Sequence, residues 1–283
     1  MPHNDLGDRV VAIADFYRCH GRLPRRRGGE FNDALYWLKV SGQLKEPDRV
    51  MTTDKGLVKE YVKEHLGDEY NVPTMAILDT RAEARAFPYP DDCVIKPTHM
   101  SGETIMRTTG APVDHDRIDT WFETNYYRDK WGWREQNYKT LRPRVIVEPL
   151  IFGRRAADDY KVFCVLGAPK AIQVDLDRST RHTRCLYTTA WDLLPYSLCY
   201  PMGRRVDKPK NLDEMLSVAR RLASGFNFVR VDLYTDGQKV YVGELTHCHG
   251  NAQEHICPGE RETAFAELLF GPGGFHRQLL ARS

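Results

Sequence analysis

One stretch of the sequence decides the fold: FVRVDLYTDGQKVYVGELT, residues 228–246. Two runs rich in Val, Tyr and Phe flank an Asp-Gly pair, and this pattern predicts a β-hairpin. The first arm carries Arg230 and Asp232, and the second arm carries Glu244. The hairpin therefore brings two carboxylates and an arginine onto neighbouring strands.

The length of the turn decides whether these side chains share one face of the sheet. A two-residue loop places Asp232 and Glu244 on opposite faces. A three-residue loop centred on Gly237 pairs Arg230 with Glu244, and Asp232 then lies one diagonal step away, at about 7–8 Å. The shared face is then either an exposed polar face with an Arg230–Glu244 ion pair, or a site for a divalent cation and a nucleoside triphosphate. The hairpin alone leaves both interpretations open.

The composition is that of a globular protein with nearly balanced charge. The 283 residues include 41 basic and 39 acidic side chains, for a net charge of +2. This balance gives no general reason to expect nucleic acid or a membrane surface as a partner. The sequence shows neither a signal peptide nor an apolar run of about 18 residues, so we expect a soluble, cytoplasmic protein. Seven cysteines without a disulfide framework predict reduced thiols.

A dense group of potential metal ligands follows the hairpin at His247, Cys248, His249, His255 and Cys257. These residues are zinc-type ligands, but their spacing matches no standard zinc finger or knuckle. Two interpretations stay open. The group forms a structural zinc site, or it is a loop that leaves the hairpin and lines part of the substrate pocket.

Hydrophobic periodicity divides the chain into a helical beginning and a mixed remainder. Helices are predicted at residues 8–21, 32–40 and 54–66, so the first 70 residues read as helical. Further on, strands are predicted at 75–78, 93–96, 105–108, 145–151, 158–166 and 170–176, and helices at 81–86, 212–224 and 260–270. Residues 177–207 show little periodicity. The predicted fold class is α+β.

The strand at residues 93–96 ends in a possible phosphate-binding element. Lys96 stands directly before a polar loop that contains Ser101 and Gly102. The lysine ammonium and the N–H groups of the loop are suited to bind the same phosphate oxygens. A surface hairpin with a solvated lysine is the alternative. The aromatic segment at residues 116–140 is expected to pack against a sheet rather than to stack on bases.

Six motifs taken in order resemble the ATP-grasp superfamily, and more closely its TupA-like branch, found among bacterial surface-polysaccharide genes. The resemblance covers residues 31–258. The motifs are TDK at 53–55, VIKP at 94–97 with HMSG at 99–102, VEPL at 147–150, DDYK at 158–161, RVD at 230–232 and GELT at 243–246. This order implies an ATP-grasp fold, in which two α+β subdomains grip ATP between antiparallel sheets.

The resemblance also implies a division of the chain and a set of nucleotide contacts. The implied parts are a helical N-terminal region at 1–70, a small subdomain with the phosphate loop at 71–147, and a C-terminal subdomain with the metal site at 148–283. The implied ATP-binding residues are Lys55, Lys96 and Lys161 at the phosphates, Ser101 and Gly102 in the loop that folds over them, Glu148, Leu150 and Ile151 at the adenine, and Asp159 near the ribose.

At the reaction centre, the resemblance implies that Arg230 stabilises the transferring phosphoryl group with help from Lys96 and Lys161. Asp232 and Glu244 match the Mg²⁺ ligands. Many ATP-grasp enzymes carry Asn where Thr246 stands, so the third metal ligand, Thr246, departs from the common pattern. The TupA-like branch resembles this sequence in its Glu-Leu-Thr. The helical N-terminal region is a second departure, because the usual first domain is Rossmann-like.

The implied reaction is ATP- and Mg²⁺-dependent ligation of a carboxylate to an amine through an acyl phosphate. The carboxylate is expected to belong to a uronic acid or an acidic peptide of a polysaccharide precursor. We expect about two arginines of the irregular segments to contact this substrate; the candidates are Arg154, Arg155, Arg178, Arg181, Arg184, Arg204 and Arg205.

Two other functions remain as alternatives. A kinase that phosphorylates a sugar hydroxyl needs a general base, for which Asp175, Asp177 and His249 are candidates. A non-catalytic nucleotide-binding partner of a glycosyltransferase is the other. The complete set of Lys96, Arg230, Asp232 and Glu244 argues against such a non-catalytic partner.

Overall fold

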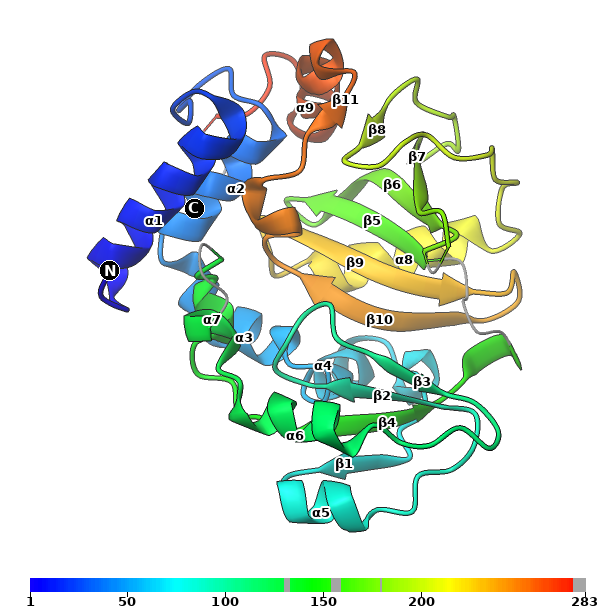
Figure 1. The fold of residues 1–283 in the computed structure, drawn as a ribbon. Coiled ribbons are helices and arrows are strands. Elements are labelled where there is room, and N and C mark those ends of the chain that lie inside the picture. The colour runs from blue at the N-terminus through cyan, green and yellow to red at the C-terminus, as the bar shows by residue number, and fades with distance from the viewer. Residues whose placement is uncertain (130–132, 154–158, 179, 277–283) are drawn as a thin grey trace.

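Two antiparallel sheets form the framework of the protein, one above the other in Figure 1. The computed structural model describes residues 1–129, 133–153, 159–178 and 180–276. The upper sheet has the order β10-β9-β5-β6-β7 and the lower sheet the order β1-β4-β2-β3. The upper strands are β5 (Asp159–Val165), β6 (Ala168–Leu176), β7 (Thr183–Thr188), β9 (Phe228–Thr235) and β10 (Val240–Thr246). The lower strands are β1 (Ala76–Leu78), β2 (Cys93–Pro97), β3 (Ile105–Arg107) and β4 (Val145–Pro149).

One face of the five-stranded sheet is apolar and packs against α8 (Leu212–Ala223). Alternate strand residues point to this face, among them Val162 and Val231. They meet Met215 and Leu222 of α8, which are fully buried. The helix repeats its apolar residues every three or four positions and the strands every second position, so both patterns meet at one interface. α4 (Val58–His65) extends this core.

The opposite face of the same sheet is divided into an apolar half and a charged half. In the apolar half, Phe163 of β5 and Phe228 of β9 pack beneath α2 (Phe31–Val40) and α9 (Glu262–Phe270). Two positions further along the strands, Lys161 and Arg230 point to the same face, because side chains alternate with a period of two. The fold therefore places charged residues on a rigid sheet beside its hydrophobic core.

The four-stranded sheet has its own core. Ile95 and Val147 pack there with Trp121 of α6 (His115–Glu123), Tyr126 of α7 (Tyr126–Asp129) and Tyr138. α5 (Arg81–Ala86) covers the edge at β1. The aromatic segment thus packs against a sheet, as the sequence predicts.

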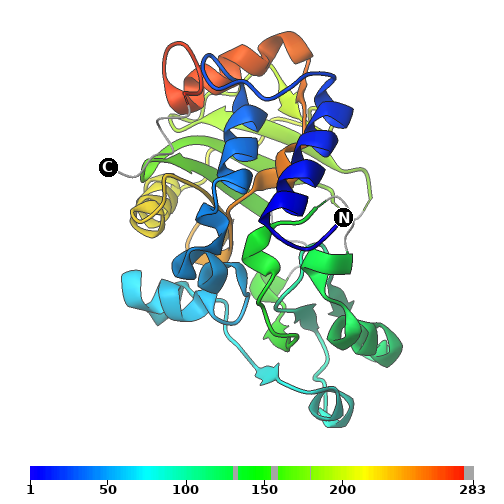
Figure 2. The same ribbon diagram turned by 90° about the vertical axis from the view of Figure 1, so that its left-hand side faces the viewer.

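The N-terminal helices connect the two sheets. α1 (Asp5–His20) packs on α2, and Figure 2 shows both helices in front of the upper sheet. α3 (Pro47–Thr53) contacts β10. Its Arg49 is 1% exposed and donates to the Phe228 carbonyl at 3.0 Å, to Asn227 Oδ1 at 2.7 Å and to His247 Nδ1 at 2.9 Å. The division at residues 70 and 147 stays a prediction.

The sequence-based elements differ from the structure mainly in two places. The helix predicted at 54–66 is wrong in its start, because the chain forms α3 first and α4 begins at Val58. Asp54 ends α3 and accepts from the N–H groups of Gly56 and Leu57 at 2.8 and 3.0 Å, which satisfies the turn between the helices. Within the aperiodic segment 177–207, the structure contains β7 and β8 (Ser197–Leu198).

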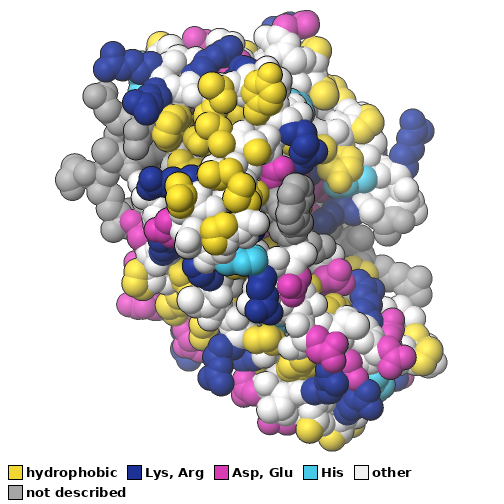
Figure 3. All heavy atoms as spheres, turned by 60° about the vertical axis from the view of Figure 1, so that its left-hand side comes forward, with side chains coloured by type: hydrophobic (Ala, Val, Ile, Leu, Met, Phe, Trp, Pro, Cys, Tyr) yellow, Lys and Arg dark blue, Asp and Glu magenta, His cyan; other side chains and the backbone are white. Residues whose placement is uncertain are grey.

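The surface over α1 is unusually apolar. Its side chains at Leu6, Val10, Ile13 and Tyr17 are 71%, 38%, 38% and 58% exposed. Figure 3 brings this side of the molecule forward and shows hydrophobic side chains gathered in its upper half. No helix among the described residues is both long enough and apolar enough to cross a membrane.

We predict that Arg49→Met lowers the free energy of unfolding by about 3 kcal/mol, because it leaves three buried acceptors without their donor. Urea unfolding followed by circular dichroism measures this change. Arg220→Met, at an exposed position of α8, is the matched control and is expected to change stability by less than about 0.5 kcal/mol. Equal stability of both variants would contradict the role given to Arg49.

Candidate functional site

The site is built on the hairpin of β9 and β10, in which Asp232 and Glu244 lie directly opposite each other. Thr235 pairs with Val240, so residues 236–239 form the turn. Neither the two-residue nor the three-residue loop considered from the sequence is present, and the Arg230–Glu244 pairing that the three-residue loop implied does not form. Arg230 pairs with Thr246 instead.

A β-bulge at Gly243 brings the two carboxylates together. The register shifts between Val242 and Glu244, which adds one residue to β10. A Cβ atom at Gly243 would lie 2.6 Å from the ring of Tyr234, so only glycine fits at this position without a shift of the ring. Directly opposed residues in an antiparallel pair point to the same side of the sheet. The turn alone would pair even with odd positions and place Asp232 and Glu244 on opposite faces of the sheet. The bulge shifts the register by one residue and brings both side chains to the same face.

Asp232 is held in its ionised form by two basic side chains. Arg230 donates to both of its oxygens at 2.7 Å, and Lys161 Nζ lies 3.1 Å from Oδ2. Burial alone would raise the pKa of Asp232, but Arg230 and Lys161 outweigh it and lower the pKa. Lys161 also pairs with Asp159, which accepts from Arg178 at 2.8 Å. The charged half of the sheet is a continuous network of ion pairs.

A second chain of hydrogen bonds and ion pairs, which starts at His249, holds Arg230 in position. Its Nη1 donates to His249 Nδ1, and because arginine only donates, the imidazole proton must be on Nε2. Nε2 donates in turn to Glu254 at 2.9 Å. Glu254 accepts from Arg184 at 2.6 Å, and Arg184 pairs with Asp175 at 2.6 Å. His249 is therefore a neutral positioning residue.

One lysine of the facing sheet and one of α4 surround a buried carboxylate of that sheet. Glu148 on β4 accepts from Lys96 of β2 at 2.8 Å and lies 2.6 Å from Lys59 of α4. Burial favours a higher pKa for Glu148, but the two lysines outweigh it and lower the pKa. Lys59 was not singled out from the sequence, because no motif marks it and its contact with Glu148 depends on how α4 packs.

Lys55 lies between the two sheets. Its Nζ donates to the Met100 carbonyl at 2.5 Å and is 4.0 Å from Glu244. The charge of Lys96 also acts on Tyr234 and Glu244 across the same gap. Lys55, from the turn between α3 and α4, and Lys96, from the lower sheet, therefore face Glu244 of the upper sheet. A gap of about 10 Å³ beside Lys55 and Lys96 is lined by Lys55, Val58, Lys59, Val62, Asn71, Lys96, Glu148, Val242 and Gly243.

The remaining predicted nucleotide-binding residues lie around this centre. The Ser101 hydroxyl interacts with those of Tyr126 and Tyr138, and Gly102 follows with a φ of +81°. Leu150 and Ile151 lie beyond the end of β4. Leu150 lines a cavity of about 470 Å³ together with Asp92, Thr108, Thr109 and Gly153. Their predicted roles stay predictions.

The histidine and cysteine group after the hairpin has other partners. His247 accepts from Arg49 and lies 2.8 Å from Thr52 Oγ1, and both nitrogens of His249 are engaged as described above. Burial raises the pKa of the Cys248 thiol. Within the described parts of the chain, no group of three or more His, Cys, Asp or Glu side chains is arranged to hold a metal ion. The loop interpretation therefore describes this segment better than structural zinc.

The arginines predicted to contact substrate separate into groups. Arg184 is buried in the network, and Arg178 pairs with Asp159. Arg181, Arg204 and Arg205 are exposed. Arg154 and Arg155 lie outside the described residues. Sequence reasoning missed Glu254, which no motif marks.

The donor set around Asp232 fits Mg²⁺. Oxygen atoms converge there from Asp232, Glu244 and Thr246, whose hydroxyl donates to Glu244 Oε1 at 3.2 Å. Mg²⁺ prefers oxygen ligands and one or two carboxylates. The lowered pKa of Asp232 leaves this carboxylate ionised at neutral pH. No sulfur or imidazole ligand is required.

Comparison with known proteins places the chain in a family. A family model described as TupA-like ATPgrasp matches residues 33–270. The chain belongs to the TupA-like ATP-grasp family. This confirms the predicted family, the α+β ATP-grasp fold and the class of enzyme, an ATP-grasp ligase. No curated protein matches the sequence.

Solved structures show distant likeness only. D-alanine–D-alanine ligase from Bacillus anthracis is 15% identical, with a TM-score of 0.47 over 84% of this chain and 74% of that chain. L-amino acid ligase from Bacillus licheniformis is 11% identical, with a TM-score of 0.45 over 88% of this chain and 56% of that chain.

Acid is predicted to destabilise the protein through this site. The pKa values of Glu148 and Asp232 are lower in the folded protein than in the unfolded chain, where they are about 4. The two carboxylates therefore contribute fully to stability above the pKa values of the unfolded chain, and this contribution is lost as the pH falls through the folded pKa values. Urea unfolding from about pH 7 to pH 3 measures the loss.

Glu148→Gln tests the cause of this dependence. We expect the variant to be less stable at neutral pH by about 3 kcal/mol, because two lysines lose their buried partner, and to depend less steeply on pH. Glu64→Gln, on the exposed face of α4, is expected to keep the wild-type profile. A Glu148→Gln profile as steep as that of the wild type would overturn the assignment.

Proposed function

We propose that this TupA-like ATP-grasp enzyme uses ATP and Mg²⁺ to join a carboxylate to an amine. The expected carboxylate is a uronic acid or an acidic peptide of a bacterial surface-polysaccharide precursor. One observation carries the proposal. The opposed pair of Asp232 and Glu244 lies beside Arg230 on one sheet, and faces Lys55 and Lys96 from the other side of the gap.

Each group has a role that follows from its charge and position. Asp232, Glu244 and Thr246 would hold Mg²⁺, which when bound neutralises charge on the phosphates. Lys55, Lys96 and Lys161 would bind the phosphate oxygens in place of their present acceptors. Arg230 is fixed on two sides and would stabilise charge on the transferring phosphoryl group without reorganising.

Nucleotide binding requires a change in the present contacts. The gap of about 10 Å³ is far smaller than the several hundred Å³ of a typical ligand pocket. The sheets must separate, or Lys59 and Lys96 must release Glu148. The cavity of about 470 Å³ beside Leu150 is large enough for a base, and supports a position for the adenine near Leu150 and Ile151.

The reaction needs no protein nucleophile. A substrate carboxylate oxygen would attack the γ-phosphorus of ATP, and ADP would leave, giving an acyl phosphate. The amine nitrogen would then form a bond to the acyl carbon as the bond to phosphate breaks, and a proton would pass to solvent. Cys248 stays a neutral thiol, because burial raises its pKa.

The contacts of two of the three candidate bases, His249 and Asp175, favour ligation over phosphorylation of a hydroxyl. His249 Nδ1 accepts from Arg230 while Nε2 donates to Glu254, so the ring offers no free lone pair. Arg184 and Lys161 outweigh the burial of Asp175 and lower its pKa, which makes it a poor base. Exposed Arg181, Arg204 and Arg205 suit an acidic substrate.

Calorimetry tests the nucleotide site. We expect ATPγS to bind the wild type in the presence of Mg²⁺, and Glu244→Gln to weaken this binding at least about tenfold, because one carboxylate ligand is lost. Glu64→Gln is the control of equal charge and is expected to bind as the wild type does. Equal binding by the wild type and Glu244→Gln would overturn the assignment of the metal site.

Product analysis separates the two reactions. A ligase releases free phosphate together with ADP, whereas a kinase leaves phosphorus bonded to the acceptor, and ³¹P spectroscopy distinguishes the two. Arg230→Ala is expected to reduce turnover by at least about a hundredfold. A phosphate ester on a hydroxyl of the acceptor would refute the ligase.

A further inference from the structure

The helix α1 is apolar on two opposite faces. Its inner face carries Ala12 and Phe16, which pack with Tyr36 of α2. Its outer face carries four exposed apolar side chains, spaced by four, three and four residues, so that they form one stripe along the helix. The α1 stripe consists of Leu6, Val10, Ile13 and Tyr17. A surface helix usually carries polar side chains on its outer face, so this stripe requires another explanation.

Exposed apolar side chains are concentrated at this end of the chain. Among the residues that the structure describes, twelve large hydrophobic side chains are exposed, and six of them lie between residues 1 and 23. Besides the α1 stripe, they are Met1 and Leu23. A concentration of this kind marks a surface that binds a partner.

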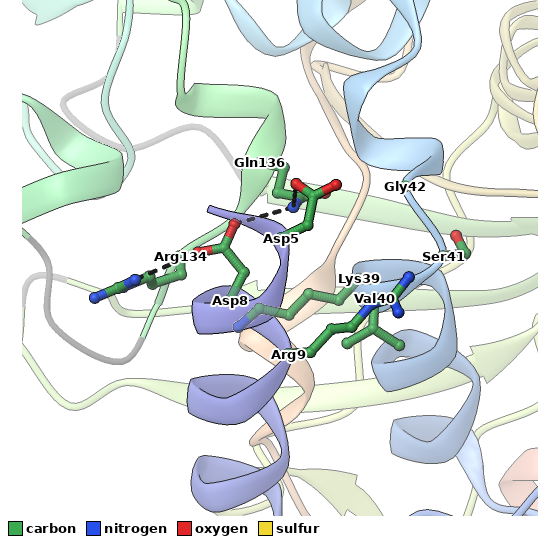
Figure 4. Close-up of a pocket in the computed structure, with 9 residues that line it drawn as sticks. All are labelled: Asp5, Asp8, Arg9, Lys39, Val40, Ser41, Gly42, Arg134 and Gln136. Atoms are coloured by element: carbon green, nitrogen blue, oxygen red, sulfur yellow. Dashed lines mark hydrogen bonds and ion pairs between the residues drawn. The ribbon is translucent and has the colours of Figure 1, made fainter. Parts of the chain in front are cut away.

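The charges of the same segment are mainly positive. The first 27 residues contain six arginines and three aspartates. Asp8 and Asp15 are buried, and Figure 4 shows Asp8 directed toward Gln136 at the cavity beside α1. Asp5 is exposed but pairs with Lys45 at 2.6 Å. An anionic partner therefore complements this surface.

Arginines lie on both flanks of the α1 stripe and beside α2. Arg9 and Arg18 are both exposed, and the helical spacing places them on opposite sides of the stripe. Arg26 lies over the ring of Trp37, 5.3 Å from its centroid, and Trp37 packs against the apolar contact between α1 and α2. An apolar stripe bordered by arginines is typical of helices that bind the surface of an anionic bilayer.

We infer that α1 binds the surface of an anionic lipid bilayer. The helix lies parallel to the membrane plane, with the α1 stripe at the boundary between headgroups and acyl chains and with arginines at the lipid phosphates. The stripe covers about 16 Å of helix, at a rise of about 1.5 Å per residue. The inference goes beyond the proposed function and does not depend on it.

The shape and charge of this surface favour a bilayer over a protein partner. α2 packs between α1 and the upper sheet, so α1 is an outer ridge rather than the wall of a groove (Figure 2). The four apolar side chains are few beside the about 20–30 residues that each partner buries in a standard protein interface. A second copy of the chain would also add its own positive charge to the contact. A bilayer accepts an apolar ridge and supplies the negative charge.

Co-sedimentation with lipid vesicles tests the inference. We expect the wild type to bind vesicles of phosphatidylglycerol and phosphatidylcholine, and to bind vesicles of phosphatidylcholine alone at least about tenfold more weakly. Added salt weakens the first interaction, because it screens the arginines. The double variant Leu6→Ser and Ile13→Ser is expected to lose at least about tenfold in affinity, since apolar area is removed from the contact. Arg9→Gln combined with Arg18→Gln is expected to weaken binding to the anionic vesicles by about tenfold.

Matched controls lie elsewhere on the surface. Met106→Ser combined with Leu166→Ser removes two apolar side chains that are 51% and 59% exposed. Lys63→Gln combined with Arg220→Gln removes two exposed positive charges. Both controls are expected to bind vesicles as the wild type does. All these variants are expected to unfold at the wild-type temperature, because the altered side chains are exposed.

Three results would overturn the inference. The first is a folded wild type that does not bind anionic vesicles, or that binds neutral vesicles equally well. The second is equal binding by the wild type and the Leu6→Ser, Ile13→Ser variant. The third is a dimer, measured by sedimentation velocity, that the same variant converts to a monomer, since this result would assign the stripe to a second copy of the chain.

Discussion

The structure depends on the one-residue bulge at Gly243. The turn between β9 and β10 pairs even with odd positions, and in that register Asp232 and Glu244 would point to opposite faces of the sheet. The extra residue restores their alignment, and the contact with Tyr234 excludes a larger side chain. A local irregularity of the backbone thus creates the paired carboxylates on which the metal site is built.

The five-stranded sheet carries hydrophobic core and charged site on a single face. α2 and α9 cover the half that contains Phe163 and Phe228, and the charged side chains begin two positions further on. The rigid core therefore fixes the strands that hold Arg230 and Asp232. Each charge there has a partner, which keeps the buried network favourable until phosphate oxygens replace some of these partners.

Much of this arrangement follows from the sequence, because periodicity and motif order are local properties. The strands at Lys96 and Glu148 and the helix at residues 212–224 were predictable from their patterns. The register of the hairpin was missed, although an isolated glycine inside a strand pattern, as at Gly243, is a signal of a β-bulge. The contacts of Lys59 with Glu148 and of Glu254 with Arg184 arise from tertiary packing between elements distant in the chain, so no spacing rule reveals them.

Anomalous diffraction from crystals grown with Mn²⁺ and ADP tests the central claim most directly. The account predicts a manganese peak at coordination distance from carboxylate oxygens of both Asp232 and Glu244, next to the nucleotide phosphates. A peak at the group from His247 to Cys257, or bound ADP with manganese away from both carboxylates, would contradict it.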